Sequence, residues 1–165
     1  MRRHTLVLLA SLAVLTAGKF EKLEPAEQDH FRALQVFMDK DEVKAFYKGK
    51  TPEERNAWLK EHGLWERFYQ YDEADRRRIV EGDVQIGDDL DQLVMAWGAP
   101  YIKNRLTGRN ASRSERYVYR FEVDKEGFAT PLGRKTDYKA VDRYQVEVIV
   151  DDNVVTELKE KSTWD

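Results

Sequence analysis

The chain has 165 residues, enough for one compact domain or for a small domain with a helical extension. Its formal net charge of −3 lacks the positive excess of a dedicated nucleic-acid-binding protein, so no nucleic-acid partner is expected. There is no cysteine, which excludes disulfides, a thiol nucleophile and cysteine-ligated metals.

The first 18 residues have the layout of a bacterial secretory signal, with two early arginines, an apolar run over residues 5–15 and short residues at 16–18. The run is shorter than the roughly 20 residues of a spanning helix. An uncleaved anchor or a buried core helix are the other interpretations. Small residues before Lys19 resemble a lipoprotein signal, but Lys19 stands where the lipidated cysteine would be. We expect an exported protein, periplasmic or associated with the outer membrane.

Residues 19–81 are predicted to form a helical subdomain. Pro25 suits a first helical turn, and apolar residues then recur at helical spacing, with an interruption at residues 39–41. Thr51 followed by Pro52, with Glu54 completing a capping box, predicts the next helix start.

A further helix is predicted over residues 64–80, after a stop at Gly63. Its first half is unusually aromatic, with Trp65, Phe68 and Tyr69 close together. A buried core explains such a stripe better than a ligand or partner surface does.

The pattern changes at residue 82, where an α+β module over residues 82–165 is predicted. A helix begins near Asp88, with Asp91 returning a capping-box bond, and ends at Gly98. Its apolar face consists of Leu90, Leu93, Val94 and Trp97. The nearby acids could hold a hard cation, but helix capping explains them more simply.

Alternating apolar residues then predict strands over residues 117–123, 144–150 and 154–158, the last two joined by a tight turn. Two connections, residues 107–114 and 124–137, look mobile. The expected fold class is α+β, with a helical subdomain followed by a helix packed on a three-stranded antiparallel sheet.

No catalytic motif stands out. The two histidines beyond the signal, His30 and His62, are far apart in sequence, and no glycine-rich phosphate loop or nucleophile motif occurs. We expect no enzyme, cofactor or metal site, and catalysis by carboxylates remains the lesser alternative.

A locally basic stretch contains Arg105, Arg109 and Arg113. These residues are candidates for contact with an acidic partner or an anionic lipid surface. The other interpretation is a solvated connector that leads into a strand.

Residues 84–158 resemble the SmpA/OmlA family of small outer-membrane lipoproteins, which includes the BamE subunit of the barrel-assembly machine. The matching pieces are Ile86-Gly87, the helix that follows, Trp97-Gly98-Ala99-Pro100 and the aromatic strand at residues 117–119. Asp88-Asp89 stand where the family usually has Met-Thr, the lipidated cysteine is absent, and the preceding helices are not part of the family core. The arrangement is also similar to that of the β-lactamase inhibitor proteins.

The resemblance implies a small adaptor module without catalysis. We therefore expect a non-catalytic envelope accessory protein that binds or scaffolds protein partners at the outer membrane. The alternative is a secreted inhibitor or a protein that binds a small ligand or lipid.

Overall fold

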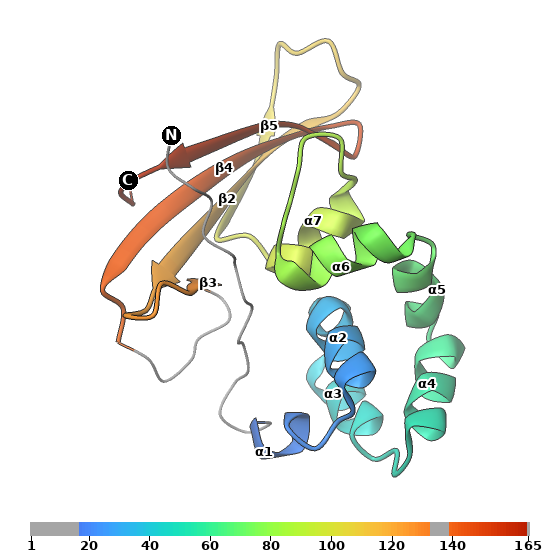
Figure 1. The fold of residues 1–165 in the computed structure, drawn as a ribbon. Helices are drawn as coiled ribbons and strands as arrows, with labels where there is room; N and C mark the ends of the chain where they lie inside the picture. The colour runs from blue at the N-terminus through green and yellow to red at the C-terminus, as the bar shows by residue number, and fades with distance from the viewer. Residues whose placement is uncertain (1–16, 133–138, 165) are drawn as a thin grey trace.

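A computed structural model describes residues 17–132 and 139–164. The predicted signal lies outside the described residues except at its end. Figure 1 shows helices α2–α5 on one side of the molecule and the sheet on the other, with α6 and α7 between them. Among the described residues, no helix has both the length and the apolar character needed to cross a membrane.

Seven α-helices and one short 3-10 helix are found in the described residues. They are α1 Ala17–Phe20, α2 Pro25–Leu34, η1 Gln35–Phe37, α3 Lys40–Phe46, α4 Pro52–Glu61, α5 Leu64–Tyr69, α6 Glu73–Glu81 and α7 Leu90–Trp97.

Helix starts follow the side chains that can cap them. Asp39 caps α3, and the Thr51 hydroxyl accepts a bond from the Glu54 N–H at the start of α4. The Glu54 carboxylate accepts from the Lys50 N–H, 2.7 Å away, so the reciprocal half of the predicted capping box goes to the preceding residue. The position of the start is confirmed.

The single helix predicted over residues 64–80 is wrong, because the structure divides it into α5 and α6. Asp72 is in extended conformation, and its carboxylate accepts a bond from the Asp75 N–H at 2.8 Å. An aspartate that binds the backbone in this way begins a new helix.

The cap of α7 is one residue later than predicted. Asp89 accepts from the Gln92 N–H, and the Gln92 side chain returns a bond to the Asp89 N–H, each at 2.8 Å. Asp88 is instead bound by Arg78 of α6 at 2.8 Å and by the Gln85 N–H. The ion pair with a distant helix decides which aspartate caps, and the sequence alone does not show that contact.

In the described residues the sheet is antiparallel and has five strands, where the sequence predicts three. The strands are β1 Ile102–Leu106, β2 Ser114–Val123, β3 Ala129–Pro131, β4 Asp142–Asp151 and β5 Val154–Lys161. Their order is β1-β2-β4-β5, and β3 lies beside the far end of β2. The α+β class is confirmed. β1 and β3 were missed because both are short, and β1 is largely polar.

Two groups of buried side chains meet at α7. Leu93, Ala96 and Trp97 pack on the sheet, with the Trp97 ring 5.1 Å from that of Tyr119. Met95 is buried among the helices instead. The predicted sheet-facing stripe is therefore correct for most of its length, but α7 also has a second buried side.

Candidate functional sites

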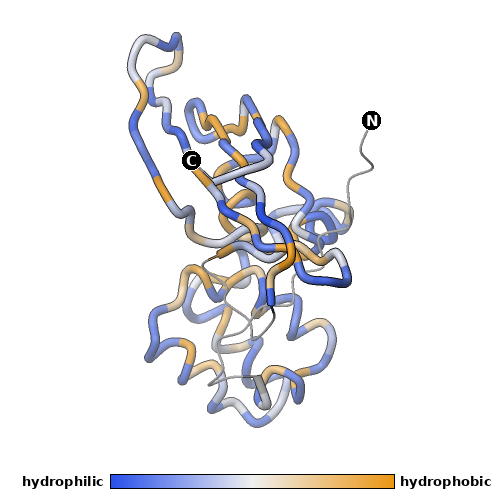
Figure 2. Tube along the Cα trace, turned by 90° about the vertical axis from the view of Figure 1, so that its left-hand side faces the viewer, coloured by the Kyte–Doolittle hydropathy of each residue, from blue (hydrophilic) through white to orange (hydrophobic). Residues whose placement is uncertain are grey.

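The β1–β2 hairpin concentrates the positive charge of the chain. The hairpin, residues 102–123, contains six basic residues and two acidic residues, a formal charge of +4 in a chain of −3. Figures 1 and 2 both show the connection between the two strands as a loop that projects from the end of the sheet. The hairpin is thus a basic projection on an otherwise acidic protein.

Two aspartates at the β4–β5 turn bind this projecting loop. Asp151 accepts from Arg109 at 2.7 Å, and Asp152 accepts from the Arg113 N–H at 2.9 Å. The Arg109 and Ser114 side chains hold the pKa of Asp151 well below its usual range. Glu157 also pairs with Arg109, at 2.8 Å. The loop predicted to be mobile is therefore fixed by bonds to its neighbouring turn.

A buried carboxylate holds the base of the hairpin. Glu115 is 7% exposed and receives bonds from Arg113 at 2.9 Å, from the Tyr117 hydroxyl at 2.8 Å and from Lys103 at 3.1 Å. Burial alone would raise its pKa, but these three donors lower the pKa to about 2. The carboxylate is thus ionised at neutral pH and orders three strand side chains.

The structure separates the three predicted arginines. Arg113 and Arg109 are paired within the chain, to Glu115 and to Asp151 with Glu157. Arg105 is exposed on β1 and has no ion-pair partner among the described residues. Two of the three arginines therefore stabilise the hairpin, and Arg105 is the one whose charge is available to a partner.

Aromatic rings and arginines alternate on the sheet face opposite α7. The Arg120 guanidinium lies over the Tyr101 ring at 4.1 Å and near the Trp164 ring at 5.3 Å. The Arg143 guanidinium also lies over the Trp164 ring, 4.9 Å from its centre. Tyr101 remains 53% exposed. This row gives the face next to β1 a rigid, partly apolar surface.

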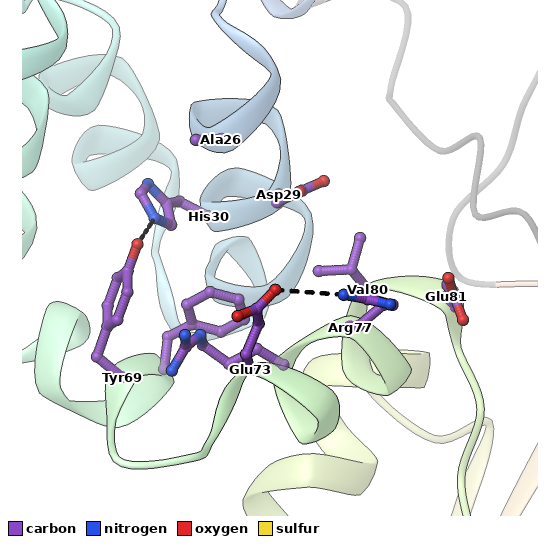
Figure 3. A pocket seen from close by; sticks show the side chains of 10 residues that line it. Ala26, Asp29, His30, Tyr69, Glu73, Arg77, Val80 and Glu81 are labelled. Carbon is purple, nitrogen blue, oxygen red and sulfur yellow. Dashed lines mark hydrogen bonds and ion pairs between the residues drawn. The ribbon is translucent and has the colours of Figure 1, made fainter.

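A pocket of about 440 Å³ lies among α2, α5 and α6 (Figure 3). The His30 Nε2 and the Tyr69 hydroxyl are 2.7 Å apart at one wall. The Arg76 guanidinium lies 4.8 Å from the Tyr69 ring centre. Phe68 and Val80 add apolar surface. The pocket combines aromatic, apolar and charged walls.

Burial shifts the pKa of two groups in the pocket. His30 is 3% exposed, and its burial lowers the pKa of the imidazole to about 4. Burial also raises the pKa of Asp29, against the opposing effect of Arg32. The histidine is therefore neutral at pH 7.

The sequence analysis missed this pocket, and no spacing in the sequence joins residues 30 and 69. The predicted burial of the aromatic stripe is correct for Phe68, whereas Tyr69 is 38% exposed and lines the pocket. No group of acids or histidines in the described ranges has the geometry of a metal site. Asp88 and Asp89 are occupied by Arg78 and by the start of α7.

Comparison of the chain with protein-family models, with curated proteins and with solved structures finds no match.

Proposed function

We propose that this protein is a non-catalytic accessory protein of the bacterial envelope, which binds a protein partner through its basic β1–β2 hairpin. The observation that carries the proposal is the formal charge of +4 on a hairpin whose projecting loop two aspartates hold in place. Preorganised charge of one sign favours association with a surface of the opposite sign.

The resemblance to the SmpA/OmlA family supports the same proposal. Gly87, the helix α7, Gly98-Ala99-Pro100 and the antiparallel strands follow one another in the order expected of that family. A BamE-like adaptor would act by contact and not by chemistry. Export to the periplasm or outer membrane belongs to this proposal and rests on the sequence of residues 1–18.

The proposal is tested by affinity capture from detergent-solubilised envelope of the source organism, with residues 19–165 as bait. A second bait changes Arg105, Arg109 and Arg113 to Ala. A matched control changes three exposed lysines of the helical region, Lys40, Lys44 and Lys48, to Ala and removes the same charge.

An envelope protein recovered in stoichiometric amount by the wild-type and lysine baits, but not by the arginine bait, is the expected result. Circular dichroism of each bait establishes that it is folded. Recovery of no protein by folded wild-type bait contradicts stable partner binding. Equal recovery by all three baits contradicts the hairpin as the binding surface.

The pocket supports a second candidate, a protein that binds a small ligand. Its volume of about 440 Å³ and its walls of Phe68, Tyr69 and Val80 suit a small organic molecule with an apolar part. Native mass spectrometry of the protein purified from its own envelope tests this function. A bound small molecule that is lost in Tyr69→Ala would support it, and a mass equal to the bare chain would contradict it.

A further inference from the structure

Among the described residues, the backbone groups on the outer edge of β1 have no partner. In β2 the N–H and C=O groups of the even-numbered residues point toward the β1 and β3 side of the strand. Two bonds show this, because the Val118 carbonyl accepts from the Tyr101 N–H and the Arg120 carbonyl accepts from the Leu132 N–H. β1 pairs Ile102, Asn104 and Leu106 with these even-numbered residues. Backbone direction alternates along an antiparallel strand, so the N–H and C=O of Lys103 and Arg105 point away from the sheet.

The opposite edge of the sheet is protected. Gly87 N–H donates to the Val155 carbonyl, and Val155 N–H donates to the Asp88 carbonyl, each at 2.8 Å. The remainder of β5 carries both signs of charge, with Glu157 and Lys159 exposed. Covering segments and charged side chains are usual means of keeping a strand edge from pairing with another chain. No segment of the described residues covers β1, and its charged side chains, Lys103 and Arg105, are both positive, so they disfavour pairing with a basic strand but not with an acidic one.

The side chains around β1 define the kind of strand that would fit. Residues 102–105 are all exposed, and Arg105 has no ion-pair partner among the described residues. The hairpin as a whole has a formal charge of +4. Tyr101 is 53% exposed, and the Arg120 guanidinium lies over its ring. These two side chains together supply a flat surface beside the edge. A strand with acidic side chains complements this edge in both backbone and charge.

We propose that β1 binds an extended acidic segment of a partner protein as an added strand of the sheet. The segment exchanges backbone hydrogen bonds with Lys103 and Arg105, and its carboxylates lie beside the Arg105 guanidinium. Strand addition of this kind takes its affinity from main-chain bonds and its specificity from alternate side chains. This inference rests on the proposed partner-binding function and names the mode of binding and the chemistry of the partner.

The test measures binding of a fluorescein-labelled peptide, Thr-Glu-Val-Glu-Val-Glu-Thr, by anisotropy. The matched peptide replaces each Glu with Gln. Two variants separate side chain from backbone: Arg105→Ala removes the guanidinium, and Arg105→Pro also removes the outward N–H. Proline is tolerated where the N–H of an edge strand faces outward, because no bond of the β1–β2 ladder is lost.

Arg105→Ala should weaken binding of the acidic peptide about two- to fivefold, the effect of one exposed ion pair. Arg105→Pro should weaken it about three- to tenfold beyond Arg105→Ala, the effect of one main-chain hydrogen bond. Weaker binding of the Gln peptide is expected as well. Two-dimensional NMR should show the largest peptide-induced shifts at the amides of residues 103 and 105, and a dispersed spectrum of the proline variant establishes that it is folded.

Equal affinity of the Ala and Pro variants, or no binding of the acidic peptide, would overturn strand addition. A third outcome is that the protein binds phosphatidylglycerol vesicles but not the peptide, and that Arg105→Pro and Arg105→Ala bind the vesicles equally well. This outcome would assign the hairpin to a membrane surface and overturn the proposal. Each of these results leaves the envelope capture experiment to decide separately whether a protein partner exists, so the two failures are distinguishable.

Discussion

Glu27 of α2 and Arg55 of α4 form the most buried ion pair among the helices, and changing Glu27 to Gln tests how much it contributes. The side chains are 3% and 11% exposed. The Arg55 Nε and Nη2 donate to the two carboxylate oxygens at 2.6 and 2.8 Å, and Arg55 Nη1 donates to the Gly49 carbonyl at 2.7 Å. Glutamine has the same shape, so the substitution removes the charge without opening a cavity.

Removal of one partner from a buried ion pair costs about 3–5 kcal/mol, because the remaining charge is left without compensation. We expect Glu27→Gln to lower the free energy of unfolding by about 3 kcal/mol, the low end of this range, since the amide oxygen still accepts one bond. Urea denaturation at pH 7, followed by circular dichroism, measures this loss. The double variant Glu27→Leu with Arg55→Met should be close to neutral, because it replaces both charges with apolar groups.

The pH dependence of the same pair has a definite sign. Burial acts to raise the pKa of Glu27, but the bonds from Arg55 and from the Glu24 N–H outweigh it and lower the pKa below 4.5. The pair therefore stabilises the protein above that pH, and its contribution is lost as the pH falls toward the lower folded pKa. A loss under about 1 kcal/mol in Glu27→Gln, with the double variant destabilised as much or more, would refute this account.

Three further outcomes are expected. His30 should make the protein less stable at pH 5 than at pH 7 by about 2 kcal/mol, because its pKa is about 4 in the folded chain and near 6.5 in the unfolded chain. In His30→Gln, the urea midpoints at the two pH values should differ less than in the wild type. Trp97→Phe should cost about 1–3 kcal/mol in the same assay, because the indole N–H donates to a buried backbone carbonyl at 2.8 Å; an unchanged midpoint would show that this bond is dispensable. Asp151→Ala should remove one of the two carboxylates that pair with Arg109 and speed amide hydrogen exchange of residues 107–113, with little effect on the core strands; unchanged exchange would mean that Asp151 does not fix the loop.

The proposed surface depends on how the hairpin is held as well as on its charge. From the sequence alone, Arg109 and Arg113 are two positive charges available to a partner. In the structure both are bound to acidic side chains of the same chain. Substituting them would loosen the loop as well as remove charge. Arg105 has no such structural role among the described residues, which makes it the cleaner position for testing a partner contact.

Local sequence by itself determined most of the elements. Capping and proline signals fixed the starts of α2 and α4, and the apolar spacing of Leu90, Leu93 and Trp97 gave the side of α7 that packs on the sheet. Alternation of apolar residues gave β2, β4 and β5. These features depend on backbone conformation and on the burial of one face, and both are encoded within a few residues.

Contacts between distant residues decided the rest. Arg78 binds Asp88, which leaves Asp89 to cap α7. The division between α5 and α6 is different, because it follows from a local cap at Asp72 that was not predicted. β1 is a strand because β2 supplies a partner for its backbone, although its own sequence is largely polar. The free edge of β1 follows from that register, because the direction of a backbone N–H depends on which residue lies opposite it and not on the side chain that it carries.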